Sequence, residues 1–266
     1  MKKRILIISG WVVLVAGASV LLGFAKSKRS STPCKSVNIS IQQKGSRGVF
    51  ITSEQIRALI VQQEQSVLEG KSMDKINLRE IESMLKDNSY IIDAQVYATL
   101  DGDINVSVTQ KNPIARIMTA NDESYYVDSV GYFMPLTDNC TPRVLVVNGY
   151  IDEPYSFNYT RNAKKMETDT SVHSLLPSVY KIASYINSDA FWKAQITQVY
   201  VDSAKEFMLI PRVGCQHIIL GDTSDLKQKF DKLFVLYKDG FNRNGKWNEY
   251  ATINLKYKHQ IICTKK

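Results

Sequence analysis

The sequence predicts an α+β protein with one N-terminal transmembrane helix, a small β-α-α-β-β domain, and a mixed β-rich domain with two main helices. Three observations predict this class: an uncharged run from Ile5 to Ala25, alternating and helical periodicities in turn between residues 35 and 113, and many short alternating segments beyond residue 113. The predicted divisions are a cytoplasmic tail at 1–4, a transmembrane helix at 5–25, a tether at 26–34, and domains at 35–113 and 114–266.

The composition, 44% hydrophobic and 23% charged, is that of a globular chain and excludes disorder, collagen and a polytopic membrane protein. The net charge of +8 invites a nucleic-acid interpretation. Six of the 34 basic residues, however, lie in the first 29 residues, where there is no acid, which leaves 28 basic against 26 acidic groups. We therefore expect no nucleic-acid partner, because so small an excess gives no phosphate-binding surface.

The uncharged run of 21 residues reaches roughly 31 Å as a helix, the thickness of a bilayer core. A cleaved signal peptide is the alternative, because Gly23 and Ala25 have the spacing that signal peptidase accepts. The run is longer than a usual signal-peptide core, which favours an uncleaved anchor. Basic residues flank the run on both sides, but a four-residue tail has little to translocate, so we expect a cytoplasmic N-terminus and an exported remainder.

In the first exported domain, alternation over 37–41 predicts a half-buried strand, and Thr52 or Ser53 can cap a helix that begins a 3.6-residue apolar period. Asn77 and Glu80 form a capping-box-like start for a second helix. A hairpin is predicted from a turn at 101–103 between two alternating segments, one over 104–108 and one at Ile92, Ala94, Val96 and Ala98. Pro113 marks the expected boundary between the two domains.

Beyond this boundary, strands are predicted at 114–119, 124–127, 132–136, 144–147, 196–201, 207–210 and 217–220, with a terminal strand pair in the last 16 residues. Residues 152–170 are polar and predict a long exposed loop. One helix is expected from about Ser174, with Pro177 in its first turn. A second follows residues 223–225, with an apolar stripe at Leu226, Phe230, Leu233, Phe234 and Tyr237.

Catalytic and metal motifs are absent from the sequence: its three histidines have no ligand spacing, and there is no nucleophile elbow, phosphate-binding loop or dinucleotide fingerprint. We therefore expect no enzyme, no cofactor, no metal and no small-molecule substrate. The cysteines are Cys34, Cys140, Cys215 and Cys263, too widely spaced for a disulfide framework; they permit three pairings, or four free thiols.

Several short motifs, in order along the chain, resemble those of the FtsQ/DivIB family of bacterial cell-division proteins. They are the helix start around Gly70, Met73, Asn77 and Ile81; YIIDAQV at 90–96; VTQKNPIAR at 108–116; YVDSVGYF at 126–133; Gly221-Asp222, Lys229 and Leu233; and INLKY at 253–257. The chain departs from the family pattern at Gln110, where an acid is usual, and at Asn254 and Lys256, which replace Asp and Arg.

The resemblance implies a non-enzymatic, single-pass scaffold of the bacterial inner membrane at the division septum, with its bulk in the periplasm. It implies a POTRA domain, whose strand order is the one that periodicity predicts for 35–113, followed by an FtsQ-type β domain at 114–266. The implied partners are divisome membrane proteins: an FtsB/FtsL-like pair and septal cell-wall synthesis proteins.

An alternating strand at the end of the chain can leave a sheet edge open to a partner strand. In the resembling family, the C-terminal part of the β domain receives the FtsB subunit, so we expect partner-binding residues here: Ile253, Leu255, Lys256, Tyr257, His259, Ile261 and Cys263. An alternative interpretation is that Lys258 and His259 only protect the edge against self-association.

Two other function classes remain open from the sequence. POTRA units also occur in polypeptide-transport proteins, although helices after Ser174 and Asp225 argue against the membrane strands that such a protein needs. An anchored extracytoplasmic hydrolase could use an unrecognised site among residues such as His217, Asp222 and Tyr257.

Overall fold

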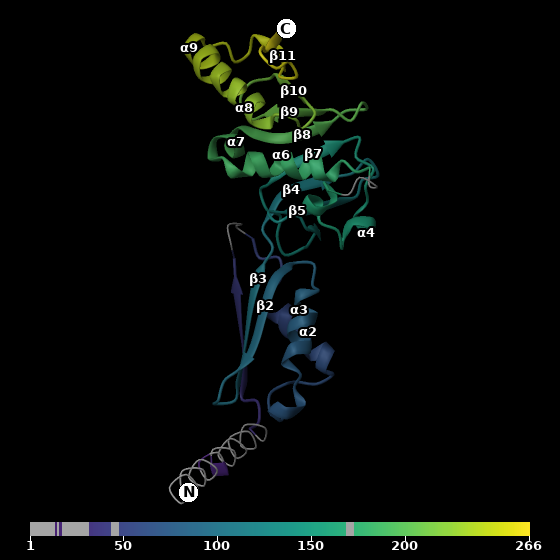
Figure 1. The fold of residues 1–266 in the computed structure, drawn as a ribbon, viewed down its shortest axis with the longest axis vertical. Coiled ribbons are helices and arrows are strands. Elements are labelled where there is room, and N and C mark those ends of the chain that lie inside the picture. Colours follow the sequence, from purple (N-terminus) through teal and green to yellow (C-terminus); the bar gives the residue numbers. More distant parts are fainter. Residues whose placement is uncertain (1–13, 15, 18–31, 44–47, 169–172) are drawn as a thin grey trace, which may run out of the picture. The chain divides into compact units, whose positions relative to one another are not determined.

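The computed structural model describes residues 14, 16, 17, 32–43, 48–168 and 173–266 (Figure 1). Its chain forms two compact units: the described parts of Met1–Gln43 with Ile51–Gln110, and the described parts of Lys44–Phe50 with Lys111–Lys266. The predicted tail at 1–4 and nearly all of the predicted membrane helix at 5–25 lie outside the described residues. Within the part that is described, no helix combines the length and apolar character needed to cross a membrane.

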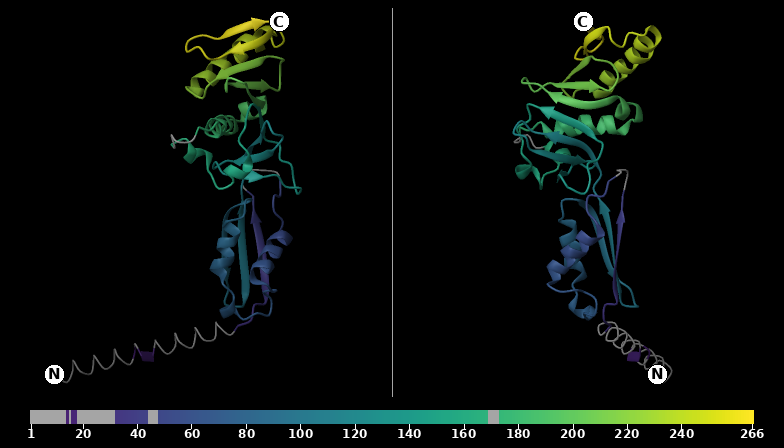
Figure 2. Two further views of the ribbon diagram at one scale, coloured as in Figure 1. Left: turned by 90° about the vertical axis from the view of Figure 1, so that its right-hand side faces the viewer. Right: turned by 180° about the vertical axis from the view of Figure 1, so that it is seen from behind.

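The first unit is a three-stranded sheet with two helices on one face (Figures 1 and 2). The sheet order is β1-β3-β2, with β1 parallel and β2 antiparallel to the central β3. The elements are β1 (Ser36–Gln42), α2 (Ser53–Glu64), the short 3₁₀ helix η1 (Met73–Lys75), α3 (Leu78–Lys86), β2 (Ile91–Ala98) and β3 (Asp103–Gln110). The predicted strand–helix–helix–strand–strand order is therefore confirmed.

Local chemistry sets both helix starts of this unit. Thr52 caps α2 in a full capping box: its hydroxyl accepts from the Gln55 N–H, and the Gln55 side chain accepts from the Thr52 N–H. Asn77 caps α3 by accepting from the Glu80 N–H. One detail of the hairpin was predicted wrongly: the register of β2 shifts between Ile91 and Asp93, so Ile91, and not Ile92, is buried there.

The second unit is built on a nine-stranded mixed sheet of order β12-β11-β10-β9-β8-β7-β4-β5-β6. Its strands are β4 (Pro113–Met118), β5 (Ser124–Asp128), β6 (Phe133–Pro135), β7 (Leu145–Gly149), β8 (Ile196–Val201), β9 (Phe207–Pro211), β10 (His217–Gly221), β11 (Tyr250–Asn254) and β12 (Ile262–Lys265). The pairs β4/β7, β7/β8 and β10/β11 are parallel, and the other neighbours are antiparallel.

The helical elements of this unit follow the chain from the residues after β7 to those before β11. They are α4 (Tyr155–Asn158), α5 (Ala163–Met166), α6 (Leu176–Ser188), α7 (Ala190–Gln195), α8 (Leu226–Val235), the π-helix η2 (Leu236–Phe241) and α9 (Asn242–Asn244). The long loop expected at 152–170 is wrong in part: most of its described residues are exposed, but the short helices α4 and α5 interrupt it and bury Asn158, Ala163 and Met166. The predicted apolar stripe of α8 is too wide, because Phe234, which it included, is 42% exposed.

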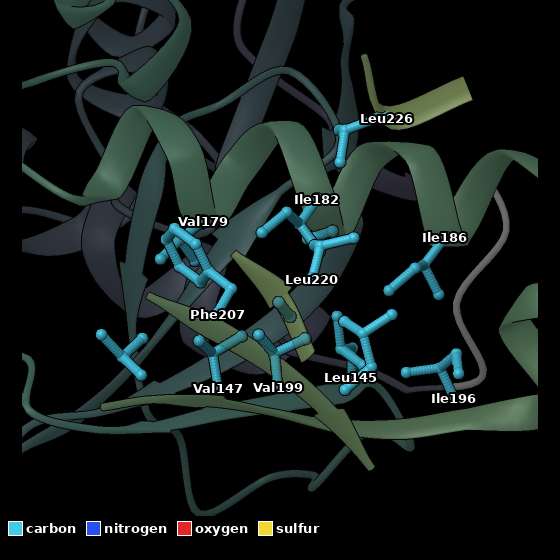
Figure 3. Packing of buried hydrophobic residues seen from close by; sticks show 14 of the residues in the cluster. Leu145, Val147, Val179, Ile182, Ile186, Ile196, Val199, Phe207, Leu220 and Leu226 are labelled. Atoms are coloured by element: carbon cyan, nitrogen blue, oxygen red, sulfur yellow. The ribbon is translucent and has the colours of Figure 1, made fainter. Parts of the chain in front are cut away.

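The core of the second unit lies between the sheet and α6, α7 and α8. Figure 3 shows Val179, Ile182 and Ile186 of α6 directed toward the side chains of Val147 and Val199 on the central strands. At the end of β7 the backbone comes so close to β8 that a Cβ on Gly149 would lie 2.1 Å from the carbonyl oxygen of Val201. Only glycine fits this approach, and its φ of +108° also favours glycine.

Candidate functional site

The predicted partner-binding residues divide into a buried and an accessible group. Ile253, on β11, and Leu255, directly after it, are both 0% exposed and belong to the core. The interpretation that their side chains contact a partner is therefore corrected: β11 lies second from the end of the sheet, and its apolar face is covered by the unit's own helices. Tyr257 is 48% exposed, Lys256 and His259 are exposed, and Ile261 and Cys263 are half-buried.

The turn between β11 and β12 is held by hydrogen bonds from three elements. The Leu255 N–H donates to the carbonyl of Ile219 on β10 at 2.9 Å. The Lys256 N–H donates to Asn254 Oδ1 at 3.0 Å, an Asx-type turn. From α8, Lys232 Nζ donates to the carbonyl oxygens of Leu255, at 3.2 Å, and of Tyr257. These bonds position the chain where it turns toward β12.

Lys256 is fixed at both ends of its side chain. Its aliphatic stem lies over Gly221, where an added Cβ would be 2.8 Å from Lys256 Cγ. Its ammonium forms an ion pair with Glu206, and the hydrogen bond to that carboxylate raises the pKa of Lys256. Lys256 therefore connects the turn to the residues before β9, and only part of the Lys256 side chain faces solvent.

β12 is the terminal strand at one end of the nine-stranded sheet. It pairs with β11 through Ile253↔Cys263 and Asn254↔Ile262. Cys263 therefore shares the core face with Ile253, while Ile262, 43% exposed, points to the opposite face. The other long edge of β12 presents main-chain N–H and C=O groups that a further strand could pair with.

The residues named for a hydrolase lie at the surface of the second unit, and Asp222 is part of a structural ion pair. His217 is an exposed residue at the start of β10, and Tyr257 lies in the turn after β11. Asp222 Oδ1 accepts from Lys229 Nζ at 2.7 Å and from Ser224, and these hydrogen bonds lower the pKa of Asp222 to about 2. No group of His, Cys, Asp and Glu that could hold a metal occurs among the described residues. All four cysteines are free thiols.

Sequence patterns did not indicate one further feature, a cavity of about 680 Å³ in the second unit. It lies where β4, β7 and β8 begin, beside the end of α6. Its lining combines aliphatic side chains, two asparagines and three cations: Ile114, Leu145, Ile186, Ile196, Asn112, Asn187, Arg143, Lys193 and Arg212. No periodicity could have indicated it, because its residues come from segments up to 100 positions apart that only strand pairing brings together.

Comparison with known families agrees with the two units. A family model described as FtsQ/DivIB, C-terminal related, matches residues 112–264, more than half of the 266-residue chain. A model of a POTRA-like domain matches residues 32–109. No curated protein matches the chain. The chain therefore belongs to the FtsQ/DivIB family, with a POTRA-like domain followed by a β-rich domain, an organisation that indicates a scaffold role in cell division.

Proposed function

We propose that this protein is a non-enzymatic divisome scaffold that links inner-membrane division proteins through its extracytoplasmic domains, and that it binds an FtsB/FtsL-type pair by strand addition at β12. The family supports the scaffold role. In this proposal residues 5–25 are an uncleaved anchor, with residues 1–4 in the cytoplasm and residues 26–266 in the periplasm, and the septal location rests on the family.

The observation that carries the proposal is the position of β12 at the end of the sheet. Its four residues pair on one side with β11 and are exposed or half-exposed along the strand. An incoming strand would gain main-chain hydrogen bonds along the free side and apolar contact with Ile262. Tyr257 and His259, exposed in the preceding turn, would flank the added strand.

The POTRA-like unit supplies a second partner surface in this proposal. Septal cell-wall synthesis proteins, or other exported segments near the membrane, would dock on it. Its two helices cover one face of the sheet and leave the other face half-exposed: Ser40 and Gln42 of β1 lie there with polar partners on β3. A polar sheet face of this kind suits reversible contacts.

Two proline variants test strand addition. The two variants are Cys263→Pro and Thr264→Pro. Because successive N–H groups of a strand point to opposite sides, one of these variants removes an N–H directed at β11 and the other removes an N–H on the free edge of β12. The full-length chain in nonionic detergent is titrated with the extracytoplasmic part of the FtsB/FtsL-type pair. The variant that retains the wild-type melting temperature should bind about tenfold more weakly, from the loss of main-chain hydrogen bonds.

The matched control is Gln260→Pro, an exposed position just before the strand, which should bind as the wild type does. Binding equal to wild type by both strand variants would exclude edge pairing. Loss of binding only in a variant whose melting temperature also falls would assign the effect to damage of the β11/β12 pair. Of the other function classes, neither polypeptide transport nor hydrolysis is favoured by a specific contact among the described residues.

A further inference from the structure

The cavity of about 680 Å³ in the β-rich unit is built by the topology of four neighbouring strands. β4, β7 and β8 are mutually parallel, so their first residues lie at the same end of the sheet. β9 runs antiparallel to β8, with Ile196 opposite Pro211, so the residue after β9, Arg212, reaches the same end. The end of α6 lines the cavity with Ile186 and Asn187.

Charge in this cavity is of one sign. Arg143, Lys193 and Arg212 line it, and none of its lining residues is an aspartate or a glutamate. All three cations are exposed, and none forms an ion pair with the described part of the chain. The nearest acid along the chain, Asp189, is occupied in capping α7, where it accepts from the N–H groups of Phe191 and Trp192.

This concentration of charge is unusual for the exported part of the chain, where 28 basic residues face 26 acidic ones. Three exposed cations at one cavity, with no carboxylate in its lining, give this part of the surface a positive potential. Such a potential favours an anionic occupant over a neutral or cationic one.

The uncharged residues of the lining indicate the chemistry of the ligand. The apolar floor of the cavity combines half-buried Pro142 and Val144 with the nearly buried Ile114, Leu145 and Ile186, and a bare phosphate or sulfate would leave the exposed part of this floor uncovered. Asn112 and Asn187 place amide groups at the wall, where they can bond to peptide N–H and C=O groups. The volume lies within the roughly 300–1,000 Å³ that hold compact ligands, which suits a few residues of chain and not a folded domain.

We propose that this cavity is a second protein-docking site of the β-rich unit, which receives a short acidic segment of a partner protein in which carboxylates alternate with aliphatic side chains. The carboxylates pair with Arg143, Lys193 and Arg212, and the aliphatic groups cover the floor. The inference rests on the proposed role as a protein-binding scaffold. It does not depend on strand addition at β12, which lies five places along the sheet from β7.

The test uses fluorescein-labelled peptides and the full-length chain in nonionic detergent, followed by fluorescence anisotropy. The probes are a Glu-Leu alternating peptide, its Gln-Leu counterpart and a Glu-Gly counterpart. The Glu-Leu peptide should bind at least tenfold more tightly than either counterpart, and its affinity should fall as sodium chloride is raised, because exposed ion pairs are screened. The triple variant Arg143→Gln, Lys193→Gln, Arg212→Gln should weaken its binding on the order of tenfold.

The matched control removes three exposed cations away from the cavity, Arg161→Gln, Lys164→Gln and Lys238→Gln, with the same change in net charge. It should bind the Glu-Leu peptide as the wild type does. Equal weakening by both triple variants would overturn the proposal in favour of nonspecific charge attraction. Equal binding of the Glu-Gly and Glu-Leu peptides, with displacement by inorganic pyrophosphate, would overturn it in favour of a small-anion site.

The proline variants of β12 separate this proposal from the proposed function. A β12 variant that loses the FtsB/FtsL-type pair should still bind the Glu-Leu peptide. Conversely, a cavity variant that loses the peptide should still bind the pair. Loss of both ligands in either variant would contradict two independent sites.

Discussion

Asp128 and Lys229 are two charged residues of the second unit whose side chains are almost fully buried. Asp128 accepts through Oδ1 from the N–H groups of Val130, Gly131 and Tyr132, at 2.7–2.9 Å, and so closes the turn between β5 and β6. Burial raises the pKa of Asp128 more than these donors lower it. Lys229 is the other, with its side chain 7% exposed. Each is held by local partners, as burial of a charge requires.

Asp222→Asn is expected to destabilise the β-rich unit at pH 7. Lys229 Nζ donates to Asp222 Oδ1 at 2.7 Å and to the Asp222 carbonyl at 2.9 Å, so the variant leaves a buried ammonium without its carboxylate. The expected loss in the free energy of unfolding is about 1–3 kcal/mol, measured by urea denaturation. Asp231→Asn is the control: its ion pair with Lys227 is exposed and should contribute little.

The destabilisation caused by Asp222→Asn should decrease as the pH is lowered. The folded-state pKa of Asp222, about 2, lies below its ordinary value of 3.8, so the folded protein holds fewer protons on this group than the unfolded chain. The stabilisation is therefore complete above about pH 4 and is lost as pH falls toward 2. The difference between wild type and Asp222→Asn should narrow over that window, and a difference independent of pH would contradict the ion pair as its source.

At the scale of elements, α8 and the terminal strand pair form one structural group. Lys232 of α8 reaches the carbonyl groups of Leu255 and Tyr257, and the Leu255 N–H bonds to β10. Phe230 of the same helix is stacked with Tyr185 of α6 at 4.6 Å between ring centroids. The turn that leads into β12 is thus positioned by a helix which is itself packed on the core, so the free edge is presented by a fixed part of the fold.

Lys232→Met should loosen this turn while retaining most of the side chain's apolar packing. Hydrogen–deuterium exchange at residues 256–265 should accelerate, because two carbonyl groups lose their charged donor. The melting temperature should change less than the local exchange. Lys238→Met, at an exposed position of η2, is the control and should leave exchange in this segment unchanged. Unchanged exchange in Lys232→Met would remove α8 as the support of the edge.

For the whole molecule, the described chain contains two separate hydrophobic clusters. One joins the helices and sheet of the first unit, and the other joins those of the second; they share no residue. Trp192 belongs to the second cluster, and Trp247 packs against it. The remaining tryptophan of the chain is Trp11, in the N-terminal segment. Tryptophan emission can therefore report on one unit alone once Trp11 is replaced.

We expect the two units to unfold as separate cooperative transitions. In a Trp11→Phe background, Ile81→Ala removes a fully buried side chain from the first core and should lower that unit's stability by about 2–5 kcal/mol. Far-UV circular dichroism should show the shift, while the midpoint of tryptophan emission stays at the background value. Leu233→Ala, also 0% exposed, should shift the emission midpoint instead. An emission shift in Ile81→Ala would contradict separate unfolding.

Local patterns in the sequence determined most elements of both units. The capping residues Thr52 and Asn77 predicted two helix starts, because a side-chain acceptor next to unpaired N–H groups needs no distant partner. Alternation predicted the strands in order along the chain. Residues 152–170 were missed because two short helices bury only a few of their side chains, too few to form a period.

Only the tertiary structure decided which residues are accessible and which segments meet. Alternation at Ile253 and Leu255 indicates a half-buried strand but cannot say whether it is an edge; strand pairing places β11 inside the sheet and β12 at its end. The same holds for Arg143, Lys193 and Arg212, which no spacing connects. Periodicity in the sequence indicates which residues are buried. It does not indicate which residues they contact, because those contacts join segments far apart in the chain and form only when the sheet is assembled.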